Sequence, residues 1–233
     1  MSTYKKSRLL GLPYIKSYSD IFANASLGIN YASGDSGIRI ESGGLAGQVL
    51  SLDQQLKNHK CIVDRISLIH GKKYLNKCLY TVTTGSNDYA NNYYGVGYLT
   101  SLFYTPQTYA VDLINRYRDF LQSLYGNGAR KVAVFGLGYL GCIPIQVQVH
   151  GVTKGSTCFE DENKAVELFN NGLIALVNQL NANYPDAKFT YINYRGIFPK
   201  PFSQGKNECL SIAYFGTRIE RTYGYMYYLI LQK

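Results

Sequence analysis

The sequence predicts an α/β fold, a three-layer α/β/α sandwich built around a parallel sheet. Three short apolar runs, at residues 79–84, 131–137 and 188–193, have the length and the β-branched or aromatic content of buried strands. The stretches between these runs repeat apolar residues at helical spacing. Strands that alternate with helices form parallel sheets through right-handed crossovers. Because no linker, repeat or low-complexity segment interrupts this order, we predict a single domain over residues 1–233.

The first predicted helix precedes the first strand and spans about residues 52–70. It opens with a capping box, in which the side chains of Ser51 and Gln54 satisfy free backbone N–H groups. Gly71 is expected to end it. Its apolar face is expected to consist of Leu52, Leu56, Ile62, Val63, Ile66 and Ile69.

The second and third predicted helices occupy the two crossovers between strands. Thr105 as N-cap and Pro106 at the first helical position start one helix, which stops at residues 126–128. The other runs from about Asp161 to Asn181. The side chains expected to face the core are Ala110, Leu113, Tyr117, Phe120, Leu121 and Leu124 in the first and Phe169, Leu173, Leu176 and Leu180 in the second.

Composition and charge argue against several functional classes. Hydrophobic residues make up 46% and charged residues 17% of the 233 residues, which is typical of a globular protein. The net charge is +9, but the basic residues occur in scattered pairs without a stripe or a nucleic-acid motif, so we expect no nucleic-acid partner. No apolar run approaches the ~20 residues of a membrane span. Residues 1–15 make a poor signal peptide, because Pro13 breaks their short apolar run.

The five cysteines predict one disulfide and no metal site. Cys142 and Cys158 flank a loop rich in Gly, Thr and Ser, and we expect a disulfide to close this loop in an oxidising compartment. The chain has no CxxC motif and no Cys/His cluster, so we expect neither a metal nor another cofactor. Asn24 heads the only glycosylation sequon, Asn24-Ala25-Ser26.

The loop after the first predicted strand is the main candidate for chemistry. Residues 85–88 read GSND. Ligands of open α/β sheets bind beyond the carboxyl ends of the strands, so polar side chains are expected to act there. The alternative is a simple turn, because these are also the commonest turn residues.

A second glycine-rich loop, GLGYLG at residues 136–141, fits the GxGxxG pattern of dinucleotide-binding domains. That pattern requires a helix directly after its third glycine. Here Pro144 opposes a helix running through it, so we disfavour this interpretation.

Three blocks taken together resemble the plant GDSL esterase/lipase family of the SGNH hydrolase superfamily. They are GINYASGDSGI at 28–38, GSNDYANNYY at 85–94 and GLGYLGCIP at 136–144, in the family's order and approximate spacing. The resemblance covers about residues 9–201 and leaves 202–233 as an unmatched tail. It implies a flavodoxin-like sheet, a mostly secreted protein and hydrolysis of carboxylic esters of lipids or acylated small molecules.

The family's catalytic site needs a nucleophilic serine, an Asp-x-x-His pair and donors for the oxyanion. Matched by motif, Gly34 and Asn87 are the oxyanion donors, a role that suits fixed dipoles which transfer no proton. Gly34-Asp35-Ser36 spells the nucleophile motif, but its flanking residues belong to the family's second block. We therefore expect Ser36 to be a loop hydroxyl, and keep it only as a substitute nucleophile.

The general base is also missing from the motifs, since no Asp is followed by a His three residues later. His59 and His70 are expected to be solvated or capping, and His150 is expected in a loop. We therefore expect a chain truncated at both ends, without the family's first strand and last helix. Such a chain would be catalytically impaired and marginally stable.

Three alternatives stay open beside impaired ester hydrolysis. The chain could bind an acyl or sugar ligand without cleaving it, in a crevice lined by Asn87, Asp88, Tyr89, Asn91 and Tyr93. An active site could be rebuilt around Ser36. The chain could also be a misassembled gene product without function. Secretion is implied by the resemblance, whereas the lack of a signal peptide in this sequence would imply a cytoplasmic protein.

Overall fold

The computed structural model describes residues 14–21, 23–152 and 156–197. The predicted tail at 202–233 and Cys209 lie outside these described residues. Three parallel strands form one sheet in the order β1 (Leu79–Val82), β2 (Lys131–Phe135) and β3 (Lys188–Ile192). Each strand lies where the sequence predicts it and ends one or two residues earlier, because the chain turns there into the loops at the carboxyl edge.

The register of the sheet brings these loops together. Leu79 lies opposite Lys131, and Lys131 lies opposite Lys188, so the strands start level with one another. All three carboxyl ends therefore lie at one edge of the sheet, and the loops after β1 and β2 emerge there side by side.

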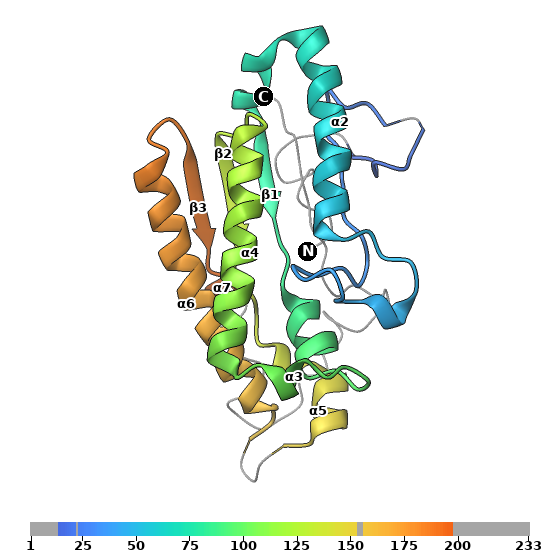
Figure 1. Ribbon diagram of the computed structural model, residues 1–233, viewed down its shortest axis with the longest axis vertical. Helices are drawn as coiled ribbons and strands as arrows, with labels where there is room; N and C mark the ends of the chain where they lie inside the picture. The colour runs from blue at the N-terminus through green and yellow to red at the C-terminus, as the bar shows by residue number, and fades with distance from the viewer. Residues whose placement is uncertain (1–13, 22, 153–155, 198–233) are drawn as a thin grey trace.

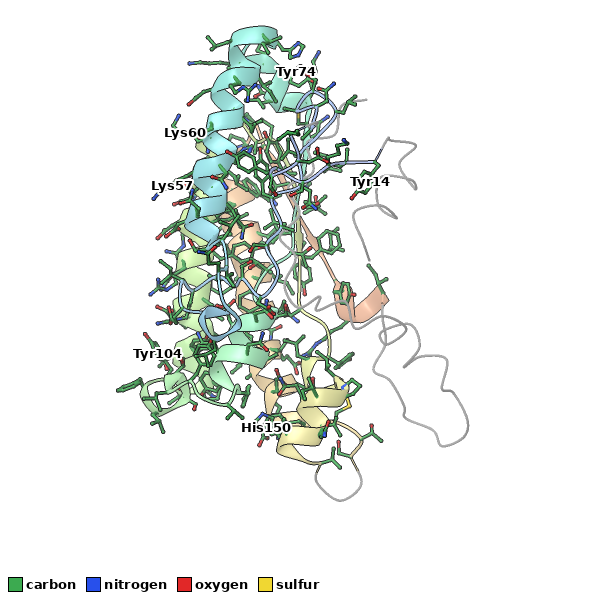
Figure 2. All side chains as sticks on the ribbon, turned by 90° about the vertical axis from the view of Figure 1, so that its right-hand side faces the viewer. Tyr14, Lys57, Lys60, Tyr74, Tyr104 and His150 are labelled. Atoms are coloured by element: carbon green, nitrogen blue, oxygen red, sulfur yellow. A yellow bond between two sulfur atoms is a disulfide. The ribbon has the colours of Figure 1, made fainter. Side chains whose placement is uncertain are left out.

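The crossover helices α4 (Pro106–Gly126) and α6 (Glu160–Asn183) pack against each other over the sheet (Figure 1). Helix α2 (Leu52–His70) lies on the β1 side and contacts α4. Lys57 and Lys60 point from α2 into solvent (Figure 2). A parallel sheet with flanking helices is the α/β sandwich that the sequence predicts.

Side-chain caps set the helix starts that the sequence predicts. Ser51 Oγ accepts a hydrogen bond from the Gln54 backbone N–H at 3.2 Å. The Gln54 side chain instead donates to Asn58 at 3.0 Å, so only half of the expected capping box forms at α2. Thr105 and Thr108 form a complete capping box at the start of α4.

The predicted core stripes of α4 and α6 are confirmed, since each of their ten side chains is at most 4% exposed. Helix α2 differs from its prediction. Its last turn extends past the end of the sheet (Figure 1). Ile69 lies in this turn and is 73% exposed. Gln55 and His59 occupy inward positions of α2 instead.

Several short elements complete the carboxyl edge: the 3-10 turns at Gly44–Ala46 and Leu140–Cys142, the π-helical turn η3 (Asp88–Tyr93) and the helices α3 (Thr100–Phe103), α5 (Pro144–His150) and α7 (Tyr194–Ile197). A further 3-10 segment, Lys72–Lys77, follows α2. The expectation that His150 lies in a loop was wrong. Pro144 starts α5 at a position where a helix needs no backbone N–H, so His150 falls in its last turn. In the described part of the chain no helix has both the length and the apolar character that crossing a membrane requires.

Candidate active site at the carboxyl edge of the sheet

Asn87 lies where β1 gives way to η3 and is fully buried. Gly85, with φ 114°, lets the chain turn out of the strand just before it. The Asn87 amide nitrogen donates to the Ser36 carbonyl at 2.9 Å, and its amide oxygen accepts from Asn91 Nδ2 at 3.0 Å. The amide is thus held in one orientation, facing the loop that contains Gly34 and Ser36.

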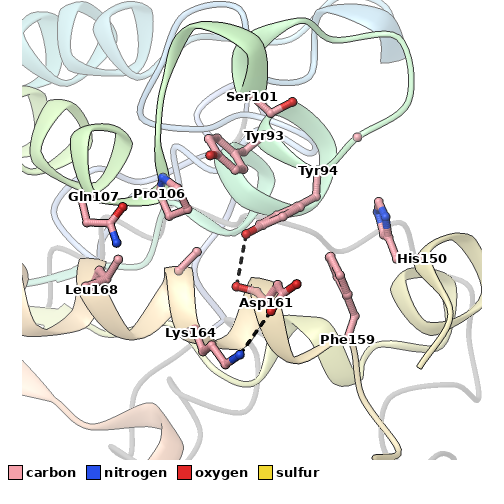
Figure 3. A pocket seen from close by; sticks show the side chains of 12 residues that line it. Tyr93, Tyr94, Ser101, Pro106, Gln107, His150, Phe159, Asp161, Lys164 and Leu168 are labelled. Atoms are coloured by element: carbon pink, nitrogen blue, oxygen red, sulfur yellow. Dashed lines mark hydrogen bonds and ion pairs between the residues drawn. The ribbon is translucent and has the colours of Figure 1, made fainter. Parts of the chain in front are cut away.

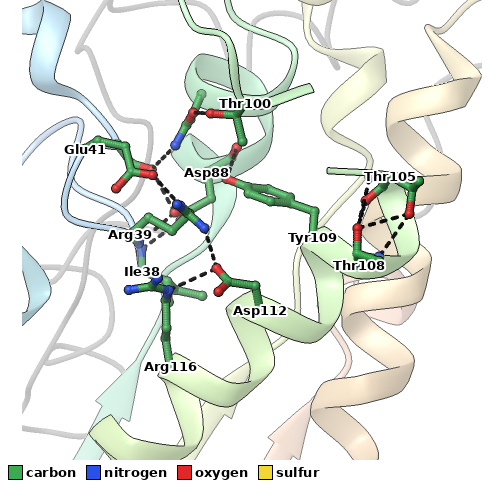
Figure 4. A network of polar contacts seen from close by, with 12 residues as sticks. Ile38, Arg39, Glu41, Asp88, Thr100, Thr105, Thr108, Tyr109, Asp112 and Arg116 are labelled. Carbon is green, nitrogen blue, oxygen red and sulfur yellow. Dashed lines mark hydrogen bonds and ion pairs between the residues drawn. The ribbon is translucent and has the colours of Figure 1, made fainter. Parts of the chain in front are cut away.

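Asp88 clamps the same loop from beside Asn87. Its carboxylate accepts hydrogen bonds from the Ile38 N–H at 2.7 Å, the Arg39 N–H at 2.9 Å and the Ser42 hydroxyl at 2.8 Å (Figure 4). Burial raises the pKa of Asp88 to about 6, against the opposing effect of these hydrogen bonds. Gly37 is needed for this approach, because a Cβ there would lie 2.4 Å from Asp88 Oδ2.

Arg39 extends the clamp to α4. Its guanidinium pairs with Glu41 and Asp112, and Asp112 also accepts from Arg116 Nε at 2.9 Å (Figure 4). The same guanidinium lies 5.0 Å from the centre of the Tyr104 ring. The loop at residues 36–42 is therefore fixed to both η3 and α4.

Ser36 is buried, with its hydroxyl engaged on both sides. Its Oγ donates to the Ser33 carbonyl at 2.8 Å and accepts from Gln55 Nε2 at 3.2 Å, and the residue is 2% exposed. Gly34 lies two residues away in an exposed turn. The fold thus brings this loop to Asn87, with the Ser36 carbonyl at the amide nitrogen.

The histidines lie apart from Ser36. His59 is fully buried, with its ring edge-on to Tyr31 and Tyr80, so the expectation of a solvated or capping side chain was wrong for it. Burial lowers the pKa of His59 to about 4. The ring of His70, at the end of α2, stacks on the ring of Tyr74, with the ring centres 4.6 Å apart. Within the described ranges none of the histidines is hydrogen-bonded to the Ser36 hydroxyl.

The crevice walls predicted from the GSNDYANNYY block are mostly core. Asn87, Asp88 and Tyr89 are fully buried and Tyr93 is 7% exposed, because η3 packs these side chains inward. Two hollows lie at this edge, of about 350 Å³ and about 580 Å³; of the predicted crevice residues, Asn91 lines the smaller hollow and Tyr93 the larger. Both are bordered by Tyr94, Gly95 and His150.

The smaller hollow lies beside the loop that contains Gly34 and Ser36, as two of its lining residues show. Asn91, the partner of Asn87, is in its wall. Gly43 is in the wall as well and packs so closely on Asp35 that a Cβ would lie 2.2 Å from the Asp35 carbonyl oxygen. The rest of this hollow is largely apolar, with Leu45, Val96, Tyr98, Ile145 and Val149 among its lining residues.

Comparison with known proteins shows the family of this chain. The family described as GDSL-like Lipase/Acylhydrolase matches residues 2–215. The chain belongs to this family. Among its relatives is the GDSL esterase/lipase At1g29660 of Arabidopsis thaliana, 46% identical over 200 residues, which are 82% of this chain and 55% of that protein. At1g29670 is 44% identical over 82% of this chain and 54% of its own length, and At2g19050 is 47% identical over 72% and 48%.

The GDSL chain thus spans about half the length of the curated relatives it matches.

The glycine-rich GLGYLGC block at residues 136–142 is fixed to α6. Cys142 and Cys158 are joined in a disulfide, with their sulfur atoms 2.10 Å apart. Asn163 of α6 accepts from the Gly141 N–H at 3.1 Å. Cys61 and Cys78 are free thiols, and no group of side chains suited to a metal ion occurs among the described residues.

Sequence reasoning missed one unusual group in the GDSL chain, the carboxyl of Glu162. This side chain is fully buried, and neither of its oxygens has a hydrogen-bond partner among the residues described. Burial raises the pKa of Glu162 to about 8. Acidic residues are usual in the first turn of a helix, so the sequence alone gives no sign of this one.

Proposed function

We propose that this chain supplies the oxyanion side of a GDSL-type ester hydrolase site and binds carboxylic esters without cleaving them by its own residues. The ligand would be an ester of a lipid or of another acylated small molecule. The observation that carries the proposal is the placement of Asn87, buried at the carboxyl edge with its amide nitrogen on the Ser36 carbonyl and its amide oxygen held by Asn91.

A fixed neutral amide suits the stabilisation of a polarised ester carbonyl. Dipoles that are oriented before the ligand arrives need no reorganisation when charge develops. An ester carbonyl reaching Asn87 would replace the Ser36 carbonyl as the acceptor on Nδ2. The backbone N–H of Gly34, in the neighbouring turn, would be the second donor.

Cleavage needs a nucleophile with a base in hydrogen-bond reach. The Ser36 hydroxyl is already held by Ser33 and Gln55. Burial among tyrosines lowers the pKa of His59 to about 4, and its ring contacts Tyr31 and not Ser36, so it does not serve as the base. We therefore expect no turnover from residues 1–233 alone.

The Cys142–Cys158 disulfide supports a secreted protein, because such bonds persist in oxidising compartments. Asn24 is exposed and would be accessible for glycosylation in that route.

Calorimetric titration with methyl octanoate, a neutral ester, tests the binding half of the proposal. We expect binding by the wild-type chain and about fivefold weaker binding by Asn87→Ala, about the effect of losing one hydrogen bond. Asn92→Ala is the matched control, since Asn92 is an equally buried amide on η3 that donates to Ser42 instead. Equal weakening in both variants, or no binding by the wild-type chain, would contradict the proposal. No binding by the wild-type chain would favour the alternative that the chain is a misassembled gene product without function.

A further inference from the structure

The larger hollow at the carboxyl edge, of about 580 Å³, is separate from the proposed ester site. It lies between η3, the start of α4, the end of α5 and the first turns of α6 (Figure 3). Neither Asn87 nor the loop at 33–38 contributes to its lining. Its volume is in the range of small-molecule sites, about 300–1,000 Å³.

Aromatic rings form a corner in this hollow. The His150 and Phe159 rings are stacked, with centres 4.4 Å apart and planes within 12°. The Tyr94 ring stands at 89° to Phe159, with ring centres 5.1 Å apart. The Tyr94 hydroxyl donates to the Asp161 carbonyl at 3.1 Å, which fixes its ring against α6. The three rings are therefore fixed against one another before a ligand arrives, and together they form the aromatic part of the lining of the hollow.

The polar groups of the hollow are balanced in charge and in hydrogen-bonding type. Lys164 and Asp161 form an exposed ion pair, with Nζ and Oδ1 at 3.2 Å (Figure 3). Gln107, an exposed amide at the start of α4, adds both donors and an acceptor. Because these two opposite charges offset each other, the pair gives the hollow no net charge that would favour an anionic or a cationic ligand.

From this combination we infer that the hollow binds a neutral sugar ring. A pyranose has one face of C–H groups, which packs against the electron-rich face of an aromatic ring. Its hydroxyls need donors and acceptors together, as the amide and the ion pair offer them. An aromatic acid or a quaternary ammonium would use the rings but would leave one member of the ion pair opposed to it.

Saturation-transfer NMR with the purified chain tests this ligand class. The probes are methyl glucoside, methyl galactoside and methyl xyloside, with benzoate and benzyltrimethylammonium as charged ring compounds. We expect signal from at least one glycoside at millimolar concentration and none from the charged compounds. Signal from a charged compound alone, or from no probe, would overturn the inference.

Variants then locate the site. Gln107→Ala removes an exposed side chain and is expected to weaken glycoside binding about fivefold, the effect of one hydrogen bond. Phe159→Leu keeps the backbone bond from its N–H to the Gly141 carbonyl and is expected to weaken binding at least about threefold.

The control is Tyr184→Leu, which breaks a stacked pair with Tyr125, centres 4.0 Å apart, at the other end of α4 and α6. A cooperative melt confirms folding of each variant. Binding that is unchanged in both site variants, or lost equally in the control, would overturn the assignment. Asn87 does not line this hollow. A chain that binds no glycoside would therefore leave the ester proposal unaffected, and a chain that binds no ester would leave the sugar site unaffected.

Discussion

Replacing Glu162 by glutamine is expected to stabilise the fold, increasingly so as the pH rises. The carboxyl is fully buried without a hydrogen-bond partner among the described residues, and its folded pKa is about 8 against an ordinary value of 4.5. Between these two values the folded chain holds a proton that the unfolded chain has released. Stability therefore falls as the pH rises from 4.5 to about 8.

The size of the effect follows from the pKa difference. Each pKa unit corresponds to about 1.4 kcal/mol, so Glu162 lowers the free energy of unfolding by about 3 kcal/mol at pH 7 and about 5 kcal/mol above pH 9. Below pH 4 both states are protonated and the penalty vanishes. Glu162→Gln keeps the shape of the protonated side chain and cannot ionise.

Urea unfolding of both proteins at pH 4, 7 and 9 measures this difference, and subtraction removes the titrations that the two proteins share. Glu167→Gln is the matched control, because Glu167 lies on the same helix with its side chain 64% exposed. We expect a stability gain that grows with pH for Glu162→Gln and no such trend for the control. A difference that is constant with pH, or a loss of stability at pH 9, would refute the reasoning.

Three further perturbations test the loop and the disulfide. Gly37→Ala should lower the free energy of unfolding in urea by about 1–3 kcal/mol, because its Cβ would overlap the Asp88 carboxylate. In the control Gly44→Ala the new Cβ meets nothing within 4 Å, so the loss should be less than 1 kcal/mol. Equal losses in the two variants would contradict the close approach of Asp88 to the loop at residues 36–42. Asp88→Asn should lower the free energy of unfolding by about 1–3 kcal/mol, because an amide nitrogen cannot accept from the loop donors, and an unchanged urea midpoint would argue against it. Reduction with dithiothreitol should lower the free energy of unfolding by about 3 kcal/mol, since the Cys142–Cys158 bond closes a loop of sequence separation 16, and an unchanged melting temperature would contradict this.

The large elements of the fold could be predicted because their signals are local. Helices α4 and α6 have continuous apolar stripes, and Thr105 with Pro106 marks one start. The strands are short apolar runs followed by glycine-containing loops. Helix α5 was missed because its seven residues are too few to show a stripe and Pro144 was interpreted only as opposing a helix.

The site was less predictable because it depends on contacts between distant residues. The clamp joins Asp88 to Ile38, 50 positions away in the sequence. Motif spacing placed Asn87 in a loop but could not show that its amide faces Ser36. The burial of His59 likewise depends on Tyr31 and Tyr80 from two other segments.

Treatment with a fluorophosphonate probe tests the central claim, that the chain holds an oxyanion side without a working nucleophile. The folded chain and a heat-denatured sample are labelled in parallel, and any adduct is located by mass spectrometry. Because the Ser36 hydroxyl is buried between Ser33 and Gln55, we predict no adduct and no release of p-nitrophenol from p-nitrophenyl octanoate. An adduct on Ser36 confined to the folded sample, accompanied by ester turnover, would contradict the account.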